Sequence, residues 1–418
     1  SVKKKVPELR FPGFTDDWEE RKFFESIAST IDFRGRTPKK LGMDWSDSGY
    51  LALSALNVKN GYIDPLADAH YGDEKLYRKW MSGRELKKGQ VLFTTEAPMG
   101  NVAQVPDDNG YILSQRTVAF ETKEDMMTND FLAVLLKSPL VFNNLSALSS
   151  GGTAKGVSQK SLKGLSITVP LDIDEQQKIG SFFKQLDNTI ALHQRKLDLL
   201  KEQKKGYLQK MFPKNGARVP ELRFAGFADD WEQRKLGDIS YKVKEKNKTG
   251  EFTETLTNSA EYGIINQRDF FDKDISNAKN LTGYYVVKND DFVYNPRISN
   301  FAPVGPIKRN KLGRTGVMSP LYYVFRTHDI DKNYFEKYFD TVYWHRFMEL
   351  NGDSGARADR FAIKDSVFVE MPIPYPTMDE QQKIGSFFKQ LDDTIALHQC
   401  KLDLLKEQKK GFLQKMFV

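Results

Sequence analysis

The sequence DEQQKIGSFFKQLDNTIALHQRKLDLLKEQKKGYLQKMF at residues 174–212 returns at residues 379–417 with three differences in 39 positions. Its apolar and central side chains follow a 3-4-3-4 spacing, which predicts a long helix with one narrow seam. The seam residues are Phe183, Leu186, Ile190, His193, Leu197 and Leu200 in the first copy and Phe388, Leu391, Ile395, His398, Leu402 and Leu405 in the second. Such a helix would be about 58 Å long. A helix with a single narrow apolar stripe needs a partner helix.

The two long segments are the nearest candidates to pair with each other. A parallel pair would relate the two halves by a translation, whereas an antiparallel pair gives a pseudo-twofold with a globular domain at each end. We expect the antiparallel coiled coil. His193 and His398 would then face each other as polar residues that help to set the register, rather than as metal ligands or catalytic groups. Asp174 and Asp379 are expected to cap the starts of the helices.

A second repeat shows that the whole chain is a tandem duplication. The box PELRFPGFTDDWEERKF at 7–23 returns as PELRFAGFADDWEQRKL at 220–236, with 13 of 17 positions identical. The order in each half is therefore box, variable region, long segment. The predicted parts are a first globular domain at 1–173, a first long helix at 174–212, a linker, box and second globular domain at 213–378, and a second long helix at 379–418.

The variable regions have drifted far apart but keep faint correspondences. Residues 91–95 resemble residues 292–296, and residues 110–114 resemble residues 315–319. Strand signals alternate with helix signals in both regions. We therefore predict an α+β fold, with two related globular domains separated by the two long helices.

Outward-facing polar residues of the long segments are also identical between the copies. The pairs expected to bind a partner are Gln176, Gln177 and Lys184 with Gln381, Gln382 and Lys389. Two explanations stay open. Either the duplication is recent and the identity has no functional meaning, or both copies present one surface to two identical partner proteins.

The net charge alone does not establish a nucleic-acid partner. The 418 residues carry 63 Lys plus Arg against 56 Asp plus Glu, a net of +7, and both variable regions are almost neutral. Position is more informative, because residues 33–43, 131–171 and 292–328 contain basic residues and no acidic ones. Basic side chains on loops rich in Gly, Ser and Thr suit contacts to phosphates and bases, although a charged run is more often a solvated face.

Motifs for catalysis are missing from the sequence. There is no phosphate-binding loop with a final Lys-Ser/Thr, no Asn-Pro-Pro-aromatic tetrad for amino methylation, and no metal-ligand spacing among the five histidines. The single cysteine, Cys400, excludes a disulfide framework and a multi-cysteine zinc site. No apolar run reaches the length of a membrane span, and the first residues lack a signal-peptide core. We expect a non-catalytic, cytoplasmic protein with no metal, no cofactor of its own and no membrane contact.

The layout resembles the specificity subunit of a type I restriction-modification enzyme. The resemblance rests on the repeated boxes and helices and on VLFTTEAPMGNVA at residues 91–103. It implies that each variable region is a target-recognition domain reading one half of a split double-stranded DNA sequence. It also implies that the helices set the spacing and dock two methyltransferase (modification) subunits, with restriction (motor-nuclease) subunits joining the complex. S-adenosylmethionine, ATP and Mg²⁺ would belong to those partner subunits.

Because the two variable regions differ, the DNA target should be asymmetric and bipartite. Half-sites about 34 Å apart would lie in successive major grooves on one face of the duplex. The expected DNA contacts of the first domain are Arg34, Arg36, Thr94, Thr95, Arg116, Thr153, Lys155 and Ser158. Those of the second domain are Asn295, Arg297, Asn300, Lys308, Arg309, Arg314, Ser354, Arg357 and Arg360.

Two other functions remain open at the level of the sequence. A self-sufficient DNA enzyme would modify or cut DNA without partners. A coiled-coil adaptor would use its domains to bind proteins or sugars, and its DNA binding would be weak and insensitive to salt.

Overall fold

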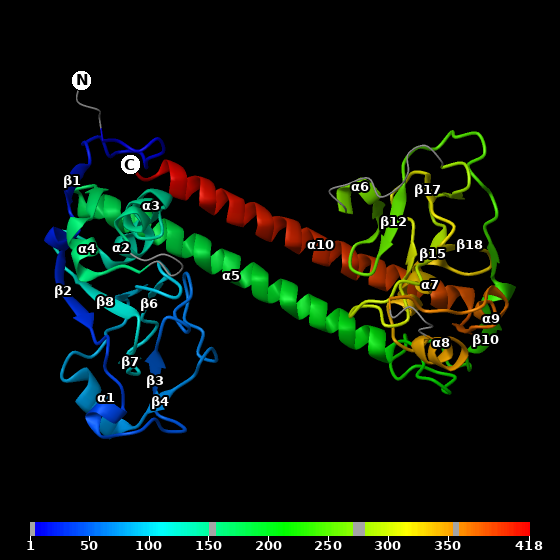
Figure 1. Ribbon diagram of the computed structural model, residues 1–418, viewed down its shortest axis with the longest axis horizontal. Helices are drawn as coiled ribbons and strands as arrows, with labels where there is room; N and C mark the ends of the chain where they lie inside the picture. Colours follow the sequence, from blue (N-terminus) through cyan, green and yellow to red (C-terminus); the bar gives the residue numbers. More distant parts are fainter. Residues whose placement is uncertain (1–4, 150–155, 271–280, 354–358) are drawn as a thin grey trace. The chain divides into compact units, whose positions relative to one another are not determined.

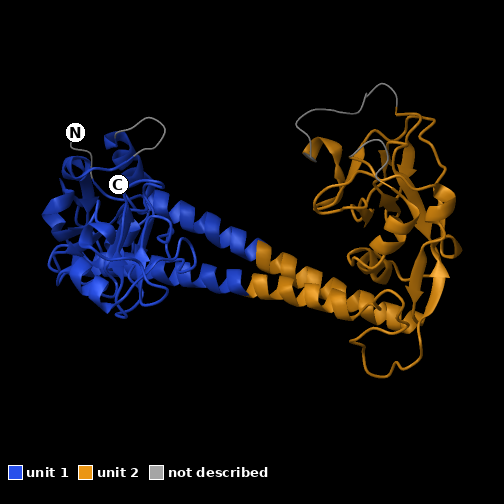
Figure 2. Cartoon of the chain, turned by 60° about the horizontal axis from the view of Figure 1, so that its bottom comes forward, with its two compact units in different colours: residues 1–195, 400–418 blue, residues 196–399 orange. Residues whose placement is uncertain are grey.

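A computed structural model describes residues 5–149, 156–270, 281–353 and 359–418. The chain divides into two compact units, residues 1–195 with 400–418 and residues 196–399 (Figure 2). Each contains one globular domain and a part of both long helices. The second unit is one continuous segment, whereas the first also includes the last residues of the chain, 400–418.

The repeated segments form two helices of 38 residues, α5 (Ile173–Lys210) and α10 (Met378–Lys415) (Figure 1). Both continue through a glycine, Gly206 or Gly411, near their last turn. A Cβ at either glycine would meet no atom within 4 Å, so neither glycine is required by packing.

The helix starts differ from the expected caps. The Asp172 carboxylate accepts a hydrogen bond from the backbone N of Asp174 at 2.8 Å, and the Thr377 hydroxyl accepts one from the backbone N of Glu380 at 3.4 Å. The prediction that Asp174 and Asp379 are the caps is therefore wrong. Both lie inside the first turn, where a carboxylate still favours the positive end of the helix dipole.

The helices run antiparallel within the first unit. The rings of Phe182 and Phe412 meet edge to face with centroids 5.0 Å apart, and Lys409 Nζ lies 2.5 Å from the carboxylate of Asp187. The contacts thus move toward lower residue numbers in α10 as they move toward higher residue numbers in α5. The predicted antiparallel pairing is confirmed here.

The second unit shows the same direction. Tyr207 meets Phe387 with ring centroids 5.0 Å apart, and Lys204 Nζ lies 2.7 Å from Asp392. All twelve predicted seam residues are buried or half-buried. His193 belongs to the first unit and His398 to the second, so their expected meeting stays a prediction.

The two globular domains share one sheet topology. The four-stranded antiparallel sheet of the first domain has the order β2-β8-β5-β6, and that of the second has the order β11-β18-β15-β16. The first sheet comprises β2 (Ile27–Asp32), β8 (Thr117–Thr122), β5 (Val91–Thr94) and β6 (Val102–Gln104). The second comprises β11 (Ser240–Lys242), β18 (Tyr323–Thr327), β15 (Phe292–Tyr294) and β16 (Ile307–Arg309). The resemblance between residues 91–95 and 292–296 thus reflects strands in the same place, β5 and β15.

Shorter strands and helices complete each domain. In the first these are β3 (Tyr50–Leu53), β4 (Tyr71–Gly72), β7 (Ile112–Leu113), α1 (Glu74–Met81), α2 (Asn129–Leu135), α3 (Pro139–Leu148) and α4 (Gln159–Gly164). In the second they are β12 (Leu256–Ser259), β13 (Gly263–Asn266), β14 (Tyr285–Val287), β17 (Gly316–Met318), α6 (Gln267–Phe270), α7 (Lys332–Phe339), α8 (His345–Asn351) and α9 (Asp365–Phe368). Strands β7 and β17 carry the second sequence correspondence.

Strand β5 is buried on both faces of its sheet. Because successive side chains of a strand point to opposite faces, Val91 and Phe93 join one hydrophobic cluster and Leu92 joins another. The first cluster contains side chains of α2, of the start of α5 and of the residues that follow α10, Met416 and Phe417. The sheet therefore sits between the helical layer and the layer of β3, β7 and α1.

The repeated boxes join each domain to the start of its long helix. Strand β1 (Glu19–Lys22) pairs antiparallel with β9 (Ser166–Val169), just before α5. Strand β10 (Glu232–Lys235) pairs in the same way with β19 (Pro372–Tyr375), just before α10. The box and the helix start, which are nearly identical in the two halves, thus form one structural joint in each.

Two of the expected partner-binding residues belong to this joint. The fully buried Gln176 side chain accepts a hydrogen bond from Thr128 N and donates one to Pro170 O, both at 3.0 Å. Gln381 is equally buried and accepts from Asp331 N at 2.9 Å. The expectation that these two glutamines face a partner is contradicted, because each ties its helix to its own domain.

The described residues contain no single helix that is long and apolar enough to cross a membrane. Helices α2 and α3 reach that length and composition only as a pair, bent by 68° at their junction.

Candidate nucleic-acid interface

Each domain has a cavity where the loops after several strands converge. In the first domain the loops after β2, β3, β5 and β7 line a cavity of about 510 Å³. In the second the loops after β12, β15 and β17 line one of about 670 Å³. Since β5 and β15, and β7 and β17, correspond between the domains, the two cavities occupy equivalent places in the fold.

Two predicted DNA contacts of the first domain meet at its cavity. The guanidinium of Arg36 lies 4.2 Å from the centroid of the Phe33 ring and donates to the carbonyl of Trp80. Arg116 is about half exposed, and its Nε lies 3.3 Å from the Glu96 carboxylate. Both arginines line the cavity. An exposed ion pair of this kind is weak, so Arg116 remains available to a ligand.

Arg34 and Ser158 lie apart from the cavity and have local partners. Arg34 donates to both carboxylate oxygens of Asp32, at distances from 2.6 to 3.0 Å. Burial raises the pKa of Asp32, but the hydrogen bonds from Arg34 outweigh it, so that the pKa is lowered. Ser158 is exposed and caps α4 by accepting from Ser161 N.

The prediction of Thr94 and Thr95 as DNA contacts is wrong. Their side chains are buried, and the Thr94 hydroxyl accepts a hydrogen bond from Asn101 N at 2.9 Å. Neither side chain is exposed to a ligand in this arrangement. Thr153 and Lys155 lie outside the described residues.

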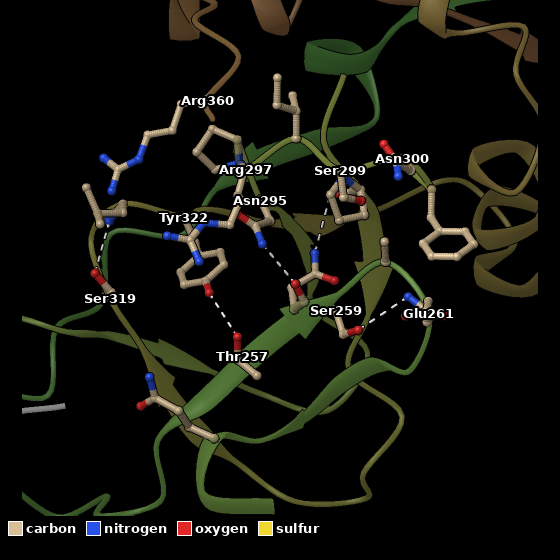
Figure 3. Close-up of a pocket in the computed structure, with 18 of the residues that line it drawn as sticks. Thr257, Ser259, Glu261, Asn295, Arg297, Ser299, Asn300, Ser319, Tyr322 and Arg360 are labelled. Carbon is tan, nitrogen blue, oxygen red and sulfur yellow. Dashed lines mark hydrogen bonds between the residues drawn. The ribbon is translucent and has the colours of Figure 1, made fainter. Parts of the chain in front are cut away.

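In the second domain the structure brings four predicted residues to one cavity. Asn295, Arg297, Asn300 and Arg360 all line it (Figure 3). The Asn295 side chain donates to Asn258 O at 2.9 Å and accepts from Arg297 N at 3.0 Å. Arg297 is nearly two-thirds exposed, and an isolated backbone bridge joins it to Arg360. Two guanidinium groups therefore lie on adjacent segments beside a rigidly held amide.

Lys308 and Arg309 are not part of this cavity. Lys308 Nζ lies 3.0 Å from the carboxylate of Asp340. The Arg309 side chain is only 9% exposed and pairs with Glu336 at 2.7 Å, so its prediction as a DNA contact is contradicted. Burial raises the pKa of Asp340, but the positive charges of Lys337 and Lys308 outweigh it and hold the pKa well below its usual range.

Arg314 also has a carboxylate partner. It donates to both oxygens of Glu254 at 2.7 Å, and these hydrogen bonds lower the pKa of Glu254. The acid-free stretch 292–328 is thus neutralised by acids from elsewhere in the fold, which no local count of charge can detect. Ser354 and Arg357 lie outside the described residues.

The cavities also contain residues that the sequence did not predict. The first is lined by Trp45, Asp68 and His70, and the second by Asn258 and Tyr322. The sequence offered one hint for Trp45, which is a large aromatic residue next to Asp44 in a polar segment between Gly42 and Gly49. Nothing in the sequence separated Asn258 from other strand residues.

The long helices present identical exposed leucines. Leu192 and Leu199 of α5, and their counterparts Leu397 and Leu404 of α10, are between 52% and 69% exposed. The predicted partner residues Gln177, Lys184, Gln382 and Lys389 are exposed as well. Lys184 contacts Asp130 at 3.2 Å, and Lys389 lies 3.8 Å from Asp393. Each helix thus carries an apolar stripe outside the seam.

Within the described parts of the chain, no group of three or more His, Cys, Asp or Glu side chains could hold a metal ion. The candidate functional features are instead two equivalent cavities lined by basic, amide and aromatic groups. Each cavity belongs to a globular domain that is joined to one of two matching helices.

The family model described as type I restriction modification DNA specificity domain matches residues 16–202 and again residues 228–407. The chain belongs to this family, whose members supply DNA specificity rather than catalysis. The two matches agree with the tandem duplication found in the sequence and with the shared sheet topology.

Two relatives come from Methanocaldococcus jannaschii. The chain is 24% identical to a protein named for the specificity subunit of type I restriction enzyme MjaX, over 95% of this chain and 92% of that protein. It is 22% identical to the type I restriction enzyme MjaVIII specificity subunit, over 72% of each chain.

Two solved structures share the fold. The S subunit of a type I restriction-modification system from M. genitalium superposes with a TM-score of 0.62, at 14% identity and 99% coverage of both chains. A chain from a structure of type I restriction-modification complex assembly gives a TM-score of 0.50, at 18% identity and 97% coverage of both.

Proposed function

We propose that the chain directs a type I restriction-modification complex to an asymmetric, bipartite DNA target, with each globular domain reading one half. The equivalence of the two cavities carries this proposal. They occupy the same place in one sheet topology, yet their side chains differ. Two domains of the same fold whose cavities are lined by different side chains would recognise two different half-sites.

The contacts that we propose in the second domain are Asn295, Arg297, Asn300 and Arg360. Arginine can bind guanine O6 and N7 with two hydrogen bonds, and asparagine can bind adenine N6 and N7 in the same way. Arg36 and Arg116 would act in the first domain. Arg309, whose side chain is buried against Glu336, and Arg314, which makes two hydrogen bonds of 2.7 Å to Glu254, would contribute to the fold instead.

The long helices would set the distance between the half-sites and bind two copies of a methyltransferase subunit. The exposed leucines support this, because a stripe such as Leu192 and Leu199 is repeated without change in the other helix. Gln177, Lys184, Gln382 and Lys389 would lie at the polar edge of the contact. Restriction subunits would join through the complex, which would act in the cytoplasm. S-adenosylmethionine, ATP and Mg²⁺ would be bound by the partner subunits.

Exchange of one domain tests this proposal. Residues 24–173 are replaced by the matching domain of another specificity subunit, and methylome sequencing reads the target in cells that also hold the methyltransferase. We expect one half of the methylated sequence to change while the other half and the gap remain. A change in both halves would contradict the assignment of one half-site to each domain.

The same complex should lose affinity for DNA steeply as salt rises, since contacts to phosphates release counterions. DNA binding that is weak and independent of salt would favour the adaptor hypothesis instead.

A further inference from the structure

The cavity of the first domain has an unusual backbone. Six non-glycine residues of the described chain have φ in the left-handed region, and three of them, Asp68 (φ 48°), Ala97 (φ 48°) and Arg116 (φ 62°), line this one cavity. Such conformations are unfavourable for residues with a Cβ and concentrate at ligand sites, where the surrounding structure holds them in place. The backbone of this cavity is therefore typical of a ligand-binding site.

An aromatic wall forms one side of the cavity. Trp45 is half-buried, and its ring lies 5.6 Å from the ring of Trp80 and 5.5 Å from that of His70. Trp80 is fully buried, and its indole N–H donates to Leu113 O at 2.9 Å. Since Trp80 is fixed, Trp45 is supported from behind as a stacking surface.

The charged groups of the cavity have both signs. Arg36, Lys39 and Arg116 supply hydrogen-bond donors, whereas Asp44 and Asp68 supply acceptors. A phosphate has acceptor oxygens only and would leave the carboxylates without a donor. A planar heterocycle with donors and acceptors along one edge would satisfy both kinds of group while stacking on Trp45.

We propose that this cavity holds one nucleobase of the first half-site, turned out of the DNA stack. The inference rests on the proposed function, since it takes the DNA half-site as the ligand. Trp45 stacks on the base, and the arginines and aspartates read its exposed edge. The second cavity is lined differently, because its exposed aromatic ring is Phe301 and its Tyr322 hydroxyl is hydrogen-bonded to Thr257 at 3.0 Å.

A mismatch scan tests the proposal in the complete complex with its methyltransferase. At each position of the first half-site the original base is kept on one strand and a mismatched base is placed opposite it. A mismatch removes the pairing that must be broken to turn the base out, so binding should tighten about ten-fold at one position. At positions read in the groove, mismatches should weaken binding.

Variants separate this effect from any base turned out by the methyltransferase. Trp45→Ala should abolish the gain at the mismatched position and weaken binding of the matched duplex about ten-fold. Arg116→Gly should also remove the gain. Glycine adopts a positive φ without strain, so this variant keeps the fold even if Trp45→Ala does not. Tyr62→Ala removes an exposed ring elsewhere in the domain and should change nothing.

If no mismatch increases the binding affinity in a way that depends on Trp45 or Arg116, the proposal of a turned-out base is wrong. The proposed function would be unaffected by that result. Failure of the wild-type complex to distinguish its target from a scrambled duplex overturns the proposed function instead.

Discussion

Arg10 and Glu175, which are 165 residues apart in the chain, form a two-pronged ion pair with N···O distances of 2.7 and 2.8 Å. Arg223 and Glu380 repeat it in the second unit at 2.7 and 2.9 Å. In each case the arginine comes from the repeated box and the glutamate from the start of a long helix. The same ion pair therefore ties the box to the start of the long helix in both halves.

Substitution of Arg10 by alanine should destabilise the first unit. Glu175 is 1% exposed, and a buried carboxylate left without its partner costs about 3 kcal/mol or more. Urea unfolding, followed by probes specific to each unit, measures the change. Lys5→Ala is the control, since Lys5 pairs with Glu20 at the surface and its loss should have little effect. Equal behaviour of the two variants would contradict a structural role for the joint.

A second prediction concerns the close approach of α5 to α2. A Cβ at Gly180 would lie 2.7 Å from Asp130 Cβ and 2.9 Å from the backbone N of Phe131. Gly180→Ala should therefore destabilise the first unit by about 1–3 kcal/mol. Gly206→Ala is the matched control in the same helix, because a Cβ there meets open space and should stabilise the helix by up to about 1 kcal/mol. Thermal unfolding that shifts in the same direction for both variants would refute this explanation.

Phe417 is expected to be needed for the fold of the first domain. Its side chain is 8% exposed, and its ring centroid lies 6.2 Å from Trp18 and 5.9 Å from Phe131. Phe417→Ala should cost about 3 kcal/mol of the free energy of unfolding of that unit. Leu192→Ala, at an exposed site, should cost much less. Hydrogen exchange in α2 reports the loss, and protection unchanged from the wild type would show that the contact is dispensable.

The repeat predicted most of the fold because its signals are local. The 3-4-3-4 spacing from Phe183 onward identified the seam, and all of its predicted members are buried or half-buried. The correspondence of residues 91–95 with 292–296 located equivalent strands. The error at the helix starts arose because Asp172 and Thr377 lie just outside the repeated sequence.

The site was harder to predict because it depends on distant partners. Arg297 and Arg309 look alike in an acid-free stretch, but Arg309 is buried against Glu336 at 2.7 Å, whereas the Arg297 side chain stays largely exposed. Gln176 looks like a surface residue of the helix, yet the joint buries it completely. The prediction for Thr94 was wrong for another reason, because both faces of its strand are covered.

The second unit should lose stability as pH falls through the range in which histidine titrates. Burial lowers the pKa of His345, and the charge of Glu349 only partly opposes this. As the pH falls below about 6.5, the unfolded chain binds a proton at His345 that the folded unit does not bind. The contribution of the neutral imidazole to the free energy of unfolding is therefore complete above about pH 6.5 and is lost as the pH falls further. His345→Gln should remove this part of the pH dependence between pH 7 and 5, as measured by urea unfolding. An unchanged slope would exclude His345 as its source.

Two arginines of the second domain should behave differently in DNA recognition. Arg297 lines the cavity and is largely exposed, whereas Arg314 is held by Glu254 outside it. Arg297→Ala should weaken binding of the target by about 1–3 kcal/mol and relax the choice of base at one position of its half-site, because the lost side chain reads a base edge. Arg314→Ala should leave the methylated sequence unchanged. Binding titrations at fixed salt, combined with methylome sequencing, compare the two variants. If Arg297→Ala weakened all sequences equally, its contact would be to phosphate rather than to a base.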